Sequence, residues 1–543
     1  MRPRDNYKNF YFCHSPGSGT PGVIRCSNTS GHSFLEDELT RNSPGIDKDV
    51  VVNGLNINGY FDVTEELMGG PYADSHKGGQ AFWSIRSPQS ATYILFNNVT
   101  ASGFNTLFTS AGRHQNGPDT LTLIFNNVAI TSWSNFGVFE VEPGFTAYTG
   151  SLIRQDPLAL SGGAKNGLGH NEHGCVRIQL AGKCVMQSCD MFSRNGWFEN
   201  ARGIHTPQPC VRWNQSGDPR GQLNMQGCAL ESGGRVIESG RDGTINPGVT
   251  SNNILIDKCA VVAGVFAIDA VTTQHSGMTM RNCVVVYGGD RSLHGAFGEA
   301  DFVRLDARWN DPVYLATPNK IYSNTFLNHH SDAQSWNGNA SVAAFRLTTV
   351  VGADFSNNTI ANNVLHQPNL PTPDVPFAPL GTGPLFTPRY DDYRGYNILS
   401  DAIELDGDIL AGSSFFVPHS RFPGIATQAD FDPAPTNLKR DHQFILNNQF
   451  GDAAYAFDAS GITVTNVSGT AWASGTAVRL NMSVVEVNVR PEYGTPDDIV
   501  WEAVPLEGST AIGAALSGPS ALDDFYGYAR PQYPSLGAFE VTF

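Results

Sequence analysis

One short motif recurs along the chain: an apolar residue, two polar or small residues, and then Val, Cys or Thr. Its clear copies are FNNV at 96–99, FNNV at 125–128, MQSC at 186–189, MQGC at 225–228, IDKC at 256–259 and MRNC at 280–283. Short apolar/polar alternation surrounds the copies, without helical periodicity. A unit of about 24 to 40 residues with short strands and Gly/Asn turns predicts a solenoid, in which each coil adds one strand to each parallel sheet. A β-sandwich or propeller with chance Asn-Asn pairs is the alternative.

The motif predicts side-chain ladders, in which Asn and Cys residues at the same point of successive coils stack on one another. Cysteines occupy the last motif position at 189, 228, 259 and 283, and Asn recurs just before it. The chain has nine cysteines, an odd number, in a repeated context, which favours buried reduced thiols over a disulfide framework. Nothing around them suggests thiolate activation, so we interpret them as packing residues.

Arginine recurs in the strand before the motif, in CVRIQL at 175–180, CVRWNQ at 210–215 and FVRLDA at 302–307. Side chains alternate between the two faces of a strand, and the apolar neighbours of each arginine face inward. The pattern therefore predicts Arg177, Arg212 and Arg304 on an outer face of the solenoid.

Acidic residues recur in the strand after the motif. Counting ten residues on from three of the motif cysteines reaches Glu199, Glu238 and Asp269, each preceded by two apolar residues. Like charges on adjacent strands repel, so a stacked acidic set needs a functional reason. We interpret it as a second charged ladder, separate from the arginines.

Composition and charge exclude several classes of protein. The 543-residue chain carries 34 Lys+Arg against 51 Asp+Glu, a formal net charge of −17, which argues against a nucleic-acid binder. With 40% hydrophobic residues, wholesale disorder is excluded. No apolar run reaches the roughly 18 residues of a membrane span, and no secretory signal peptide is visible.

Three regions follow from these patterns. Residues 1–45 are irregular and predict an N-terminal cap. Residues 46–470 predict the solenoid, with a proline-rich insertion at about 366–440. Residues 471–543 predict a β-rich region that covers the open end, because an uncovered sheet edge invites aggregation.

Three C-terminal stretches are similar to known proteins: YDDYRGYNIL at 390–399, GSTAIGAA at 508–515 and GYARPQYPSLGAFE at 527–540. They resemble the closing segment of right-handed parallel β-helix proteins of the pectate-lyase-like superfamily. This resemblance implies an all-β, right-handed parallel β-helix. The superfamily includes polysaccharide lyases, glycoside hydrolases, carbohydrate epimerases and bacteriophage tailspikes. Without a visible signal peptide, the chain is most similar in character to a tailspike depolymerase, which implies a homotrimer, attachment to a virion, and a virion-surface or extracellular location.

Two reactions fit the charged residues. Glycoside hydrolysis needs two carboxylates, and Glu199 with Glu238 on neighbouring coils would supply them, with Asp269 as base or binding residue. Polysaccharide β-elimination needs cations that neutralise the uronate carboxylate and a base for the abstracted proton. The arginine set fits the first requirement, and His173 or His205 the second.

Cofactors are not required by either pattern. Ca²⁺ is the candidate that the resemblance to lyases implies, with the acidic set as its oxygen ligands. We predict no metal site from the residues themselves, since His-x-x-His at 170–173 is more typical of an exposed loop.

The charged residues also have a purely structural alternative: outward Arg and Glu can form ion pairs or solvate an exposed sheet.

Trp197, Trp213 and Trp309 lie in or beside the coils with the candidate charges. Sugar rings stack on flat aromatic surfaces, so these residues are candidate substrate-binding groups; a tryptophan that fills a buried corner is the equal alternative. The sequence thus predicts binding and cleavage of a long acidic cell-surface or extracellular polysaccharide. The alternative is a non-catalytic carbohydrate-binding spike, adhesin or structural virion protein.

Overall fold

A computed structural model describes the strands of the chain and several turns between them. The described residues are 9–13, 22–25, 35–36, 48–58, 81–85, 92–104, 106–110, 121–132, 139–141, 145–155, 175–179, 183–193, 209–214, 222–232, 235–240, 253–263, 269–273, 277–287, 299–307, 318–328, 341–350, 359–366, 396–403, 414–418, 445–450, 453–458, 461–465, 482–488, 499–509, 511–515 and 521–541. This part of the chain is all-β, and it contains no helix that could cross a membrane. The chain divides into an N-terminal unit, Met1–Asn246, and a C-terminal unit, Pro247–Phe543.

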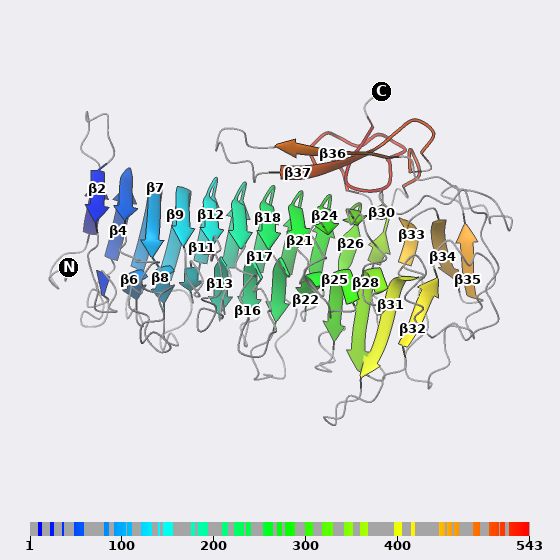
Figure 1. The fold of residues 1–543 in the computed structure, drawn as a ribbon, viewed down its shortest axis with the longest axis horizontal. Helices are drawn as coiled ribbons and strands as arrows, with labels where there is room; N and C mark the ends of the chain where they lie inside the picture. Colours follow the sequence, from blue (N-terminus) through cyan, green and yellow to red (C-terminus); the bar gives the residue numbers. More distant parts are fainter. Residues whose placement is uncertain are drawn as a thin grey trace, which may run out of the picture. The chain divides into compact units, whose positions relative to one another are not determined.

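The N-terminal unit is built from coils of three strands, and each strand pairs in parallel with its counterpart in the next coil (Figure 1). The first strands are β1 (Asn9–Cys13), β4 (Lys48–Asn53), β11 (Phe145–Thr149), β14 (Lys183–Gln187) and β17 (Gln222–Gln226). The second strands are β2 (Gly22–Arg25), β5 (Leu55–Asn58), β12 (Leu152–Gln155), β15 (Asp190–Ser193) and β18 (Ala229–Ser232), while β7 (Thr92–Phe104) and β9 (Leu121–Ser132) span both positions. The third strands are β3 (Leu35–Glu36), β6 (Ala81–Ile85), β8 (Thr106–Ser110), β10 (Phe139–Val141), β13 (Val176–Gln179), β16 (Val211–Asn214) and β19 (Ile237–Gly240).

The C-terminal unit repeats this arrangement. Its first strands are β20 (Asn253–Asp257), β23 (Met278–Arg281), β26 (Lys320–Tyr322) and β29 (Thr359–Ala361). Its second strands are β21 (Ala260–Ala263), β24 (Val284–Tyr287), β27 (Thr325–Asn328) and β30 (Val364–His366). Its third strands are β22 (Asp269–Thr273), β25 (Glu299–Ala307), β28 (Ser341–Val350) and β31 (Tyr396–Ile403). Stacked parallel strands in both units confirm the solenoid-like β class that the repeat predicts.

Strand β33 (Ile445–Phe450) adds one more parallel strand beside β29 and β30. Antiparallel pairs complete the C-terminal unit: β31 with β32 (Ser414–Pro418), β33 with β34 (Ala453–Asp458), β34 with β35 (Gly461–Thr465), and β36 (Met482–Asn488) with β37 (Ile499–Pro505). Strands β31 and β32 fall within the predicted insertion and continue the third-strand sheet. At the other end of the chain, β1–β3 pair in parallel with β4–β6. Parallel pairing therefore begins at Asn9, inside the stretch predicted as an irregular cap.

The recurring motif is the corner between the first and second strands of a coil. Its third residue has a left-handed backbone, which Gly and Asn adopt most readily. The corner residues are Gly54, Asn98, Asn127, Gly150, Ser188 and Gly227 in the N-terminal unit, and Lys258, Asn282, Ser323 and Asn362 in the C-terminal unit. The residue after the corner points inward, and Cys189, Cys228, Cys259 and Cys283 are all buried there. The predicted cysteine packing is confirmed.

The interior of the N-terminal unit is filled by stacked apolar side chains. The rings of Phe96 and Phe125 lie 5.3 Å apart between centroids, and those of Phe125 and Tyr148 lie 5.0 Å apart. Each is fully buried, and so is Trp213 on β16. Equivalent positions of successive coils thus form continuous rows, which a parallel register makes possible.

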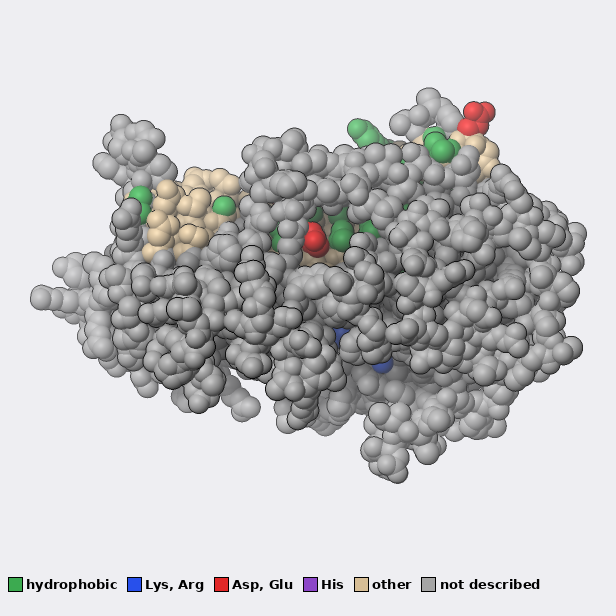
Figure 2. Space-filling model, in the orientation of Figure 1, with side chains coloured by type: hydrophobic (Ala, Val, Ile, Leu, Met, Phe, Trp, Pro, Cys, Tyr) green, Lys and Arg blue, Asp and Glu red, His purple; other side chains and the backbone are tan. Residues whose placement is uncertain are grey.

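Asparagines form a second kind of row, on the outside of the first coils. The side-chain amide of Asn126 donates to Asn97 Oδ1, and that of Asn97 donates to Asn53 Oδ1, both at 2.7 Å. Asn127 donates to Asn98 Oδ1 in the same way. Figure 2 shows a tan surface, the colour of uncharged polar side chains and of the backbone, in the region where Figure 1 draws β7 and β9. The asparagine ladder predicted from the motif is confirmed.

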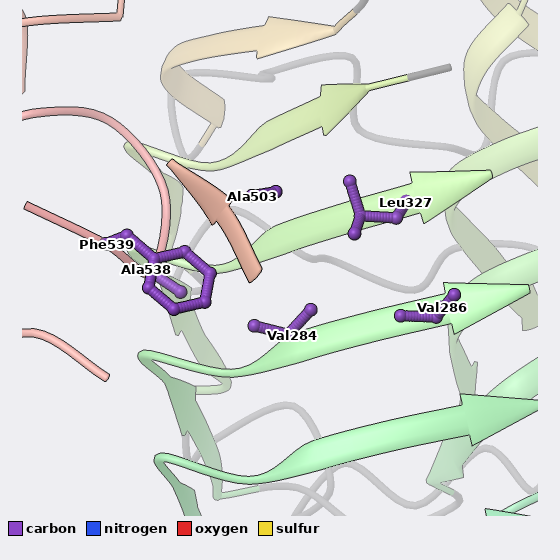
Figure 3. Packing of buried hydrophobic residues seen from close by; sticks show 6 residues of the cluster. All are labelled: Val284, Val286, Leu327, Ala503, Ala538 and Phe539. Carbon is purple, nitrogen blue, oxygen red and sulfur yellow. The ribbon is translucent and has the colours of Figure 1, made fainter. Parts of the chain in front are cut away.

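The C-terminal segment packs on the outer side of the second-strand sheet. Val284, Val286 and Leu327 face outward and form a buried cluster with Ala503, Ala538 and Phe539 (Figure 3). Further along, Val364 on β30 packs with Ala511 and Leu536. The prediction for this region differs from the structure: its described residues cover the outer surface of β24, β27 and β30 rather than the open end.

Candidate functional site

The predicted arginines and acidic residues of the N-terminal unit share one strand position. In the third-strand sheet, Glu140 on β10 is the register partner of Arg177 on β13, Arg177 of Arg212 on β16, and Arg212 of Glu238 on β19. We call Glu140, Arg177, Arg212 and Glu238 the charged row. The prediction of two separate ladders, one basic and one acidic, is therefore wrong for this unit.

Alternation along each strand sets the orientation of the row. Val176 and Ile178, which flank Arg177, are buried, and so are Val211 and Trp213 on either side of Arg212. Residues between two inward-facing neighbours belong to the outer face. Arg212 and Glu238 are partly exposed there, with 27% and 17% of their side chains accessible.

Two guanidinium groups surround the carboxylate of Glu238. Arg212 Nε lies 3.4 Å from Glu238 Oε2, and Arg235 Nη1 lies 3.1 Å from Glu238 Oε1. Partly exposed ion pairs of this kind contribute little stability, about 1 kcal/mol or less each. Their main effect is on the geometry of the site, because they hold two guanidinium groups around one carboxylate.

The predicted like-charge pair of Glu199 and Glu238 has no counterpart among the described residues. Glu199 lies outside them, and the position beside Glu238 in β16 belongs to Arg212. Glu238 is thus an ion-pair partner on an arginine-bearing face, and its described register partner in β16 is a guanidinium rather than the carboxylate that a shared proton requires.

The C-terminal unit has its own charged positions in the third-strand sheet. Thr272, Arg304 and Arg346 are register partners on β22, β25 and β28. Asp269 and Asp301 are also register partners, so two carboxylate residues occupy one position on neighbouring strands. Sequence reasoning missed Asp301, although Asp-Ala-Val at 269–271 and Asp-Phe-Val at 301–303 share a pattern that could have found it.

The aromatic and histidine candidates are placed only in part. Trp213 is 1% exposed and fills the interior, the corner-filling role weighed as its alternative, so it offers no ring face to a sugar on the outer surface. Trp197, Trp309, His173 and His205 lie outside the described residues.

Burial shapes the chemistry of the cysteines. It is the main cause that raises the pKa of Cys184 and Cys210, since the interior disfavours a thiolate. A hydrogen bond with Cys228 and burial raise the pKa of Cys189 as well. The thiols of Cys189 and Cys210 donate to backbone carbonyls, to Gln187 O at 3.4 Å and to Met191 O at 3.3 Å, and act as packing groups.

Metal ligation has no candidate in the part of the chain that the structure describes, where no group of three or more His, Cys, Asp or Glu side chains is close enough to hold an ion. The Ca²⁺ site implied by the resemblance to lyases stays a prediction.

The described fold and site define an all-β protein of stacked parallel strands, with Arg and Glu residues in register on the third-strand sheet of the N-terminal unit. Comparison with protein-family models found none that matches this chain, and no curated protein matches it. Two features of the third-strand sheet bear on its function: the charged row of the N-terminal unit, and the register of Asp269 with Asp301 in the C-terminal unit.

Proposed function

We propose that the protein is a right-handed parallel β-helix of the pectate-lyase-like type that binds a long acidic polysaccharide along its third-strand face. The observation that carries this proposal is the register of Arg177 with Arg212, which sets two arginines at equivalent positions of successive coils. Parallel strands lie about 4.8 Å apart, so such positions form a linear array that suits a linear polymer.

Guanidinium groups recognise carboxylates through two parallel hydrogen bonds. Arg212 and Arg235 already hold the carboxylate of Glu238, which supports a site for a second carboxylate of similar geometry. A uronate group would exchange with Glu238 or share its arginines. Because these groups are partly exposed, binding should weaken as salt rises.

The test compares Arg212→Ala with Lys183→Ala, which removes an exposed cation from the first strand of the same coil. Affinity electrophoresis in polygalacturonate, alginate and hyaluronan gels should show at least about 10-fold weaker binding for Arg212→Ala, the loss of a hydrogen bond to a charged group. Lys183→Ala should bind like the wild type, and Arg212→Lys should lie between them. Equal binding by Arg212→Ala and the wild type would overturn the proposal.

Cleavage of the polysaccharide is a second candidate, favoured by the register of Asp269 with Asp301. Retaining glycosidases hold two carboxyl groups about 5 to 5.5 Å apart, close to the spacing of neighbouring strands. Fragment release, followed by size exclusion and by the ultraviolet absorbance of unsaturated uronates, separates the outcomes. Fragments without absorbance that Asp301→Asn abolishes indicate a hydrolase. Absorbing fragments that depend on arginine indicate a lyase, and binding without fragments indicates a recognition spike.

The tailspike resemblance extends the proposal to a homotrimer attached to a virion or otherwise extracellular. Light scattering at micromolar concentration tests the assembly directly. A trimeric mass supports this part of the proposal, and a monomeric mass removes it while leaving the glycan-binding face untouched.

A further inference from the structure

Exposed aromatic side chains gather in the C-terminal segment at 521–541. Tyr528 and Tyr533 are 63% and 71% exposed, and Tyr526 is 43% exposed. Most large exposed apolar residues among those described follow β37 in the C-terminal unit: Leu506, Leu522, Tyr526, Tyr528 and Tyr533. Exposed aromatic residues on a protein surface mark candidate binding sites.

The loop that carries Tyr526 and Tyr528 is held in one conformation. A single oxygen, Asp524 Oδ1, accepts hydrogen bonds from the backbone N–H groups of Tyr526 at 3.0 Å and Tyr528 at 2.8 Å. Asp524 is 2% exposed, and Gly527 between the tyrosines has φ +87°, which favours glycine. Phe525 anchors the loop from below, with its ring centroid 5.2 Å from that of Phe539.

The rest of the segment fixes this loop to the solenoid. Arg530 and Glu540 form a buried ion pair at 2.6 Å, and Arg530 also donates to Asn282 Oδ1 at a coil corner. Beside the loop, Lys258 Nζ lies 2.5 Å from Asp523 Oδ2. The two exposed rings, 6.4 Å apart between centroids, therefore project from a rigid base.

We propose that Tyr526 and Tyr528 form an aromatic shelf on the C-terminal unit that binds an uncharged pyranose unit of a glycan. This inference rests on the proposed glycan-binding function and adds a second subsite to it. Tyrosine offers a flat apolar face and a hydroxyl at its edge, which complement the C–H face and the rim hydroxyls of a sugar ring. A preorganised loop binds without the entropic cost of ordering.

Charge identifies the kind of sugar. The charged side chains at the loop in the described structure already have partners: Lys258 pairs with Asp523, and Asp524 accepts the loop's backbone N–H groups. No arginine is free to receive a carboxylate there, since Arg530 is 2% exposed and paired with Glu540. The shelf thus selects neutral units, whereas the charged row selects acidic ones.

Tyr528→Ala is the test variant, because the Tyr526 ring also contacts Phe525 and Phe539 inside the segment. Tyr533→Ala is the matched control, an exposed tyrosine of the same segment. Titration with neutral gluco- and galacto-oligosaccharides, followed by tyrosine fluorescence and saturation-transfer NMR, should show binding about 3- to 10-fold weaker for Tyr528→Ala. Tyr528→Trp should restore it, and Tyr533→Ala should match the wild type.

The outcomes separate this inference from the proposed function. If Arg212→Ala loses acidic polysaccharide while Tyr528→Ala binds neutral oligosaccharides as the wild type does, the shelf is wrong and the charged row stands. If the wild type binds no glycan, both are wrong. If Tyr528→Ala instead reduces self-association in sedimentation, the surface is a protein interface and the inference is overturned.

Discussion

Gly537 is the position where a single methyl group should most clearly disturb the C-terminal segment. Its φ is +88°, and a Cβ added there would lie 2.6 Å from Thr325 Oγ1 and 3.4 Å from Val364 Cγ2. Hydrogen bonds fix both sides of the contact: Gly537 N–H donates to Asn362 O, and Ala538 N–H donates to Thr325 Oγ1, each at 2.9 Å. Neither the segment nor β27 can move away without breaking one of them.

The cost of Gly537→Ala has two parts. A left-handed backbone costs a residue with a Cβ about 1–2 kcal/mol. Overpacking against fixed neighbours adds about 1–3 kcal/mol. We expect a loss of about 2–5 kcal/mol in the free energy of unfolding.

Gly508→Ala carries only the first part, the backbone cost, because Gly508 has φ +82° with nothing within 4 Å of its added Cβ; the difference between the two variants therefore measures the overpacking. Urea unfolding followed by far-ultraviolet circular dichroism should show a loss of only about 1–2 kcal/mol for this control. In the Gly537→Ala, Thr325→Ala double variant, removal of Oγ1 should make the cost smaller than the sum of the single changes. Equal losses for Gly537→Ala and Gly508→Ala would refute the close packing of the segment on β27.

Three further predictions concern buried polar groups. Glu540→Gln should cost about 3–5 kcal/mol, because it leaves the guanidinium of Arg530 buried without its ionic partner, and early cleavage of the C-terminal segment in limited proteolysis would report it. Asn324→Ala should cost about 1–3 kcal/mol, because the amide bonds Cys283 N–H and Met280 O inside the coil, and unchanged urea unfolding would contradict this. Burial raises the pKa of Cys184 in the folded protein. The contribution of this protonated thiol to the free energy of unfolding is therefore complete below the unfolded thiol pKa of about 8.5, and it is lost as the pH rises, by about 1.4 kcal/mol per pH unit. Urea midpoints at pH 7.5, 9 and 10 under reducing conditions should therefore fall less steeply for Cys184→Ala than for the wild type.

The corners of the coils were predictable because their geometry is strictly local. A left-handed residue must join the first and second strands, and few residue types accept that backbone. Asn98, Asn127 and Gly227 therefore leave a visible pattern, and the next residue's inward direction follows from it. Lys258 departs from the rule: it adopts φ +55° at a corner, and its side chain pairs with Asp523 of the C-terminal segment. No local pattern predicts a residue whose partner lies so far along the chain.

The partners within the third-strand sheet were not predictable by counting, because the connection into the third strand varies in length. Residues 233–236 separate β18 from β19, so the count of ten from Cys228 correctly reaches β19 at Glu238. Residues 194–210 separate β15 from β16, and the same count from Cys189 ends inside the connection, at Glu199. The cross-section of a coil is set by its strands, so a connection can lengthen without shifting the register of the next strand.

The length of the connection into the third strand determines which side chain lies beside Glu238. Had β16 followed β15 as closely as β19 follows β18, Glu199 would stand beside Glu238, and repulsion between the two carboxylates would raise the pKa of one of them, as a general acid requires. With the longer connection, β16 brings Arg212 to that position, and Glu238 becomes one end of an ion pair. The proposed binding of an anion at this position rests on Arg212 and Arg235, and the proposed cleavage rests on Asp269 and Asp301, which are register partners on β22 and β25. The fragment-release assay with Glu238→Gln and Asp301→Asn tests this assignment directly: loss of activity in Glu238→Gln alone would contradict it.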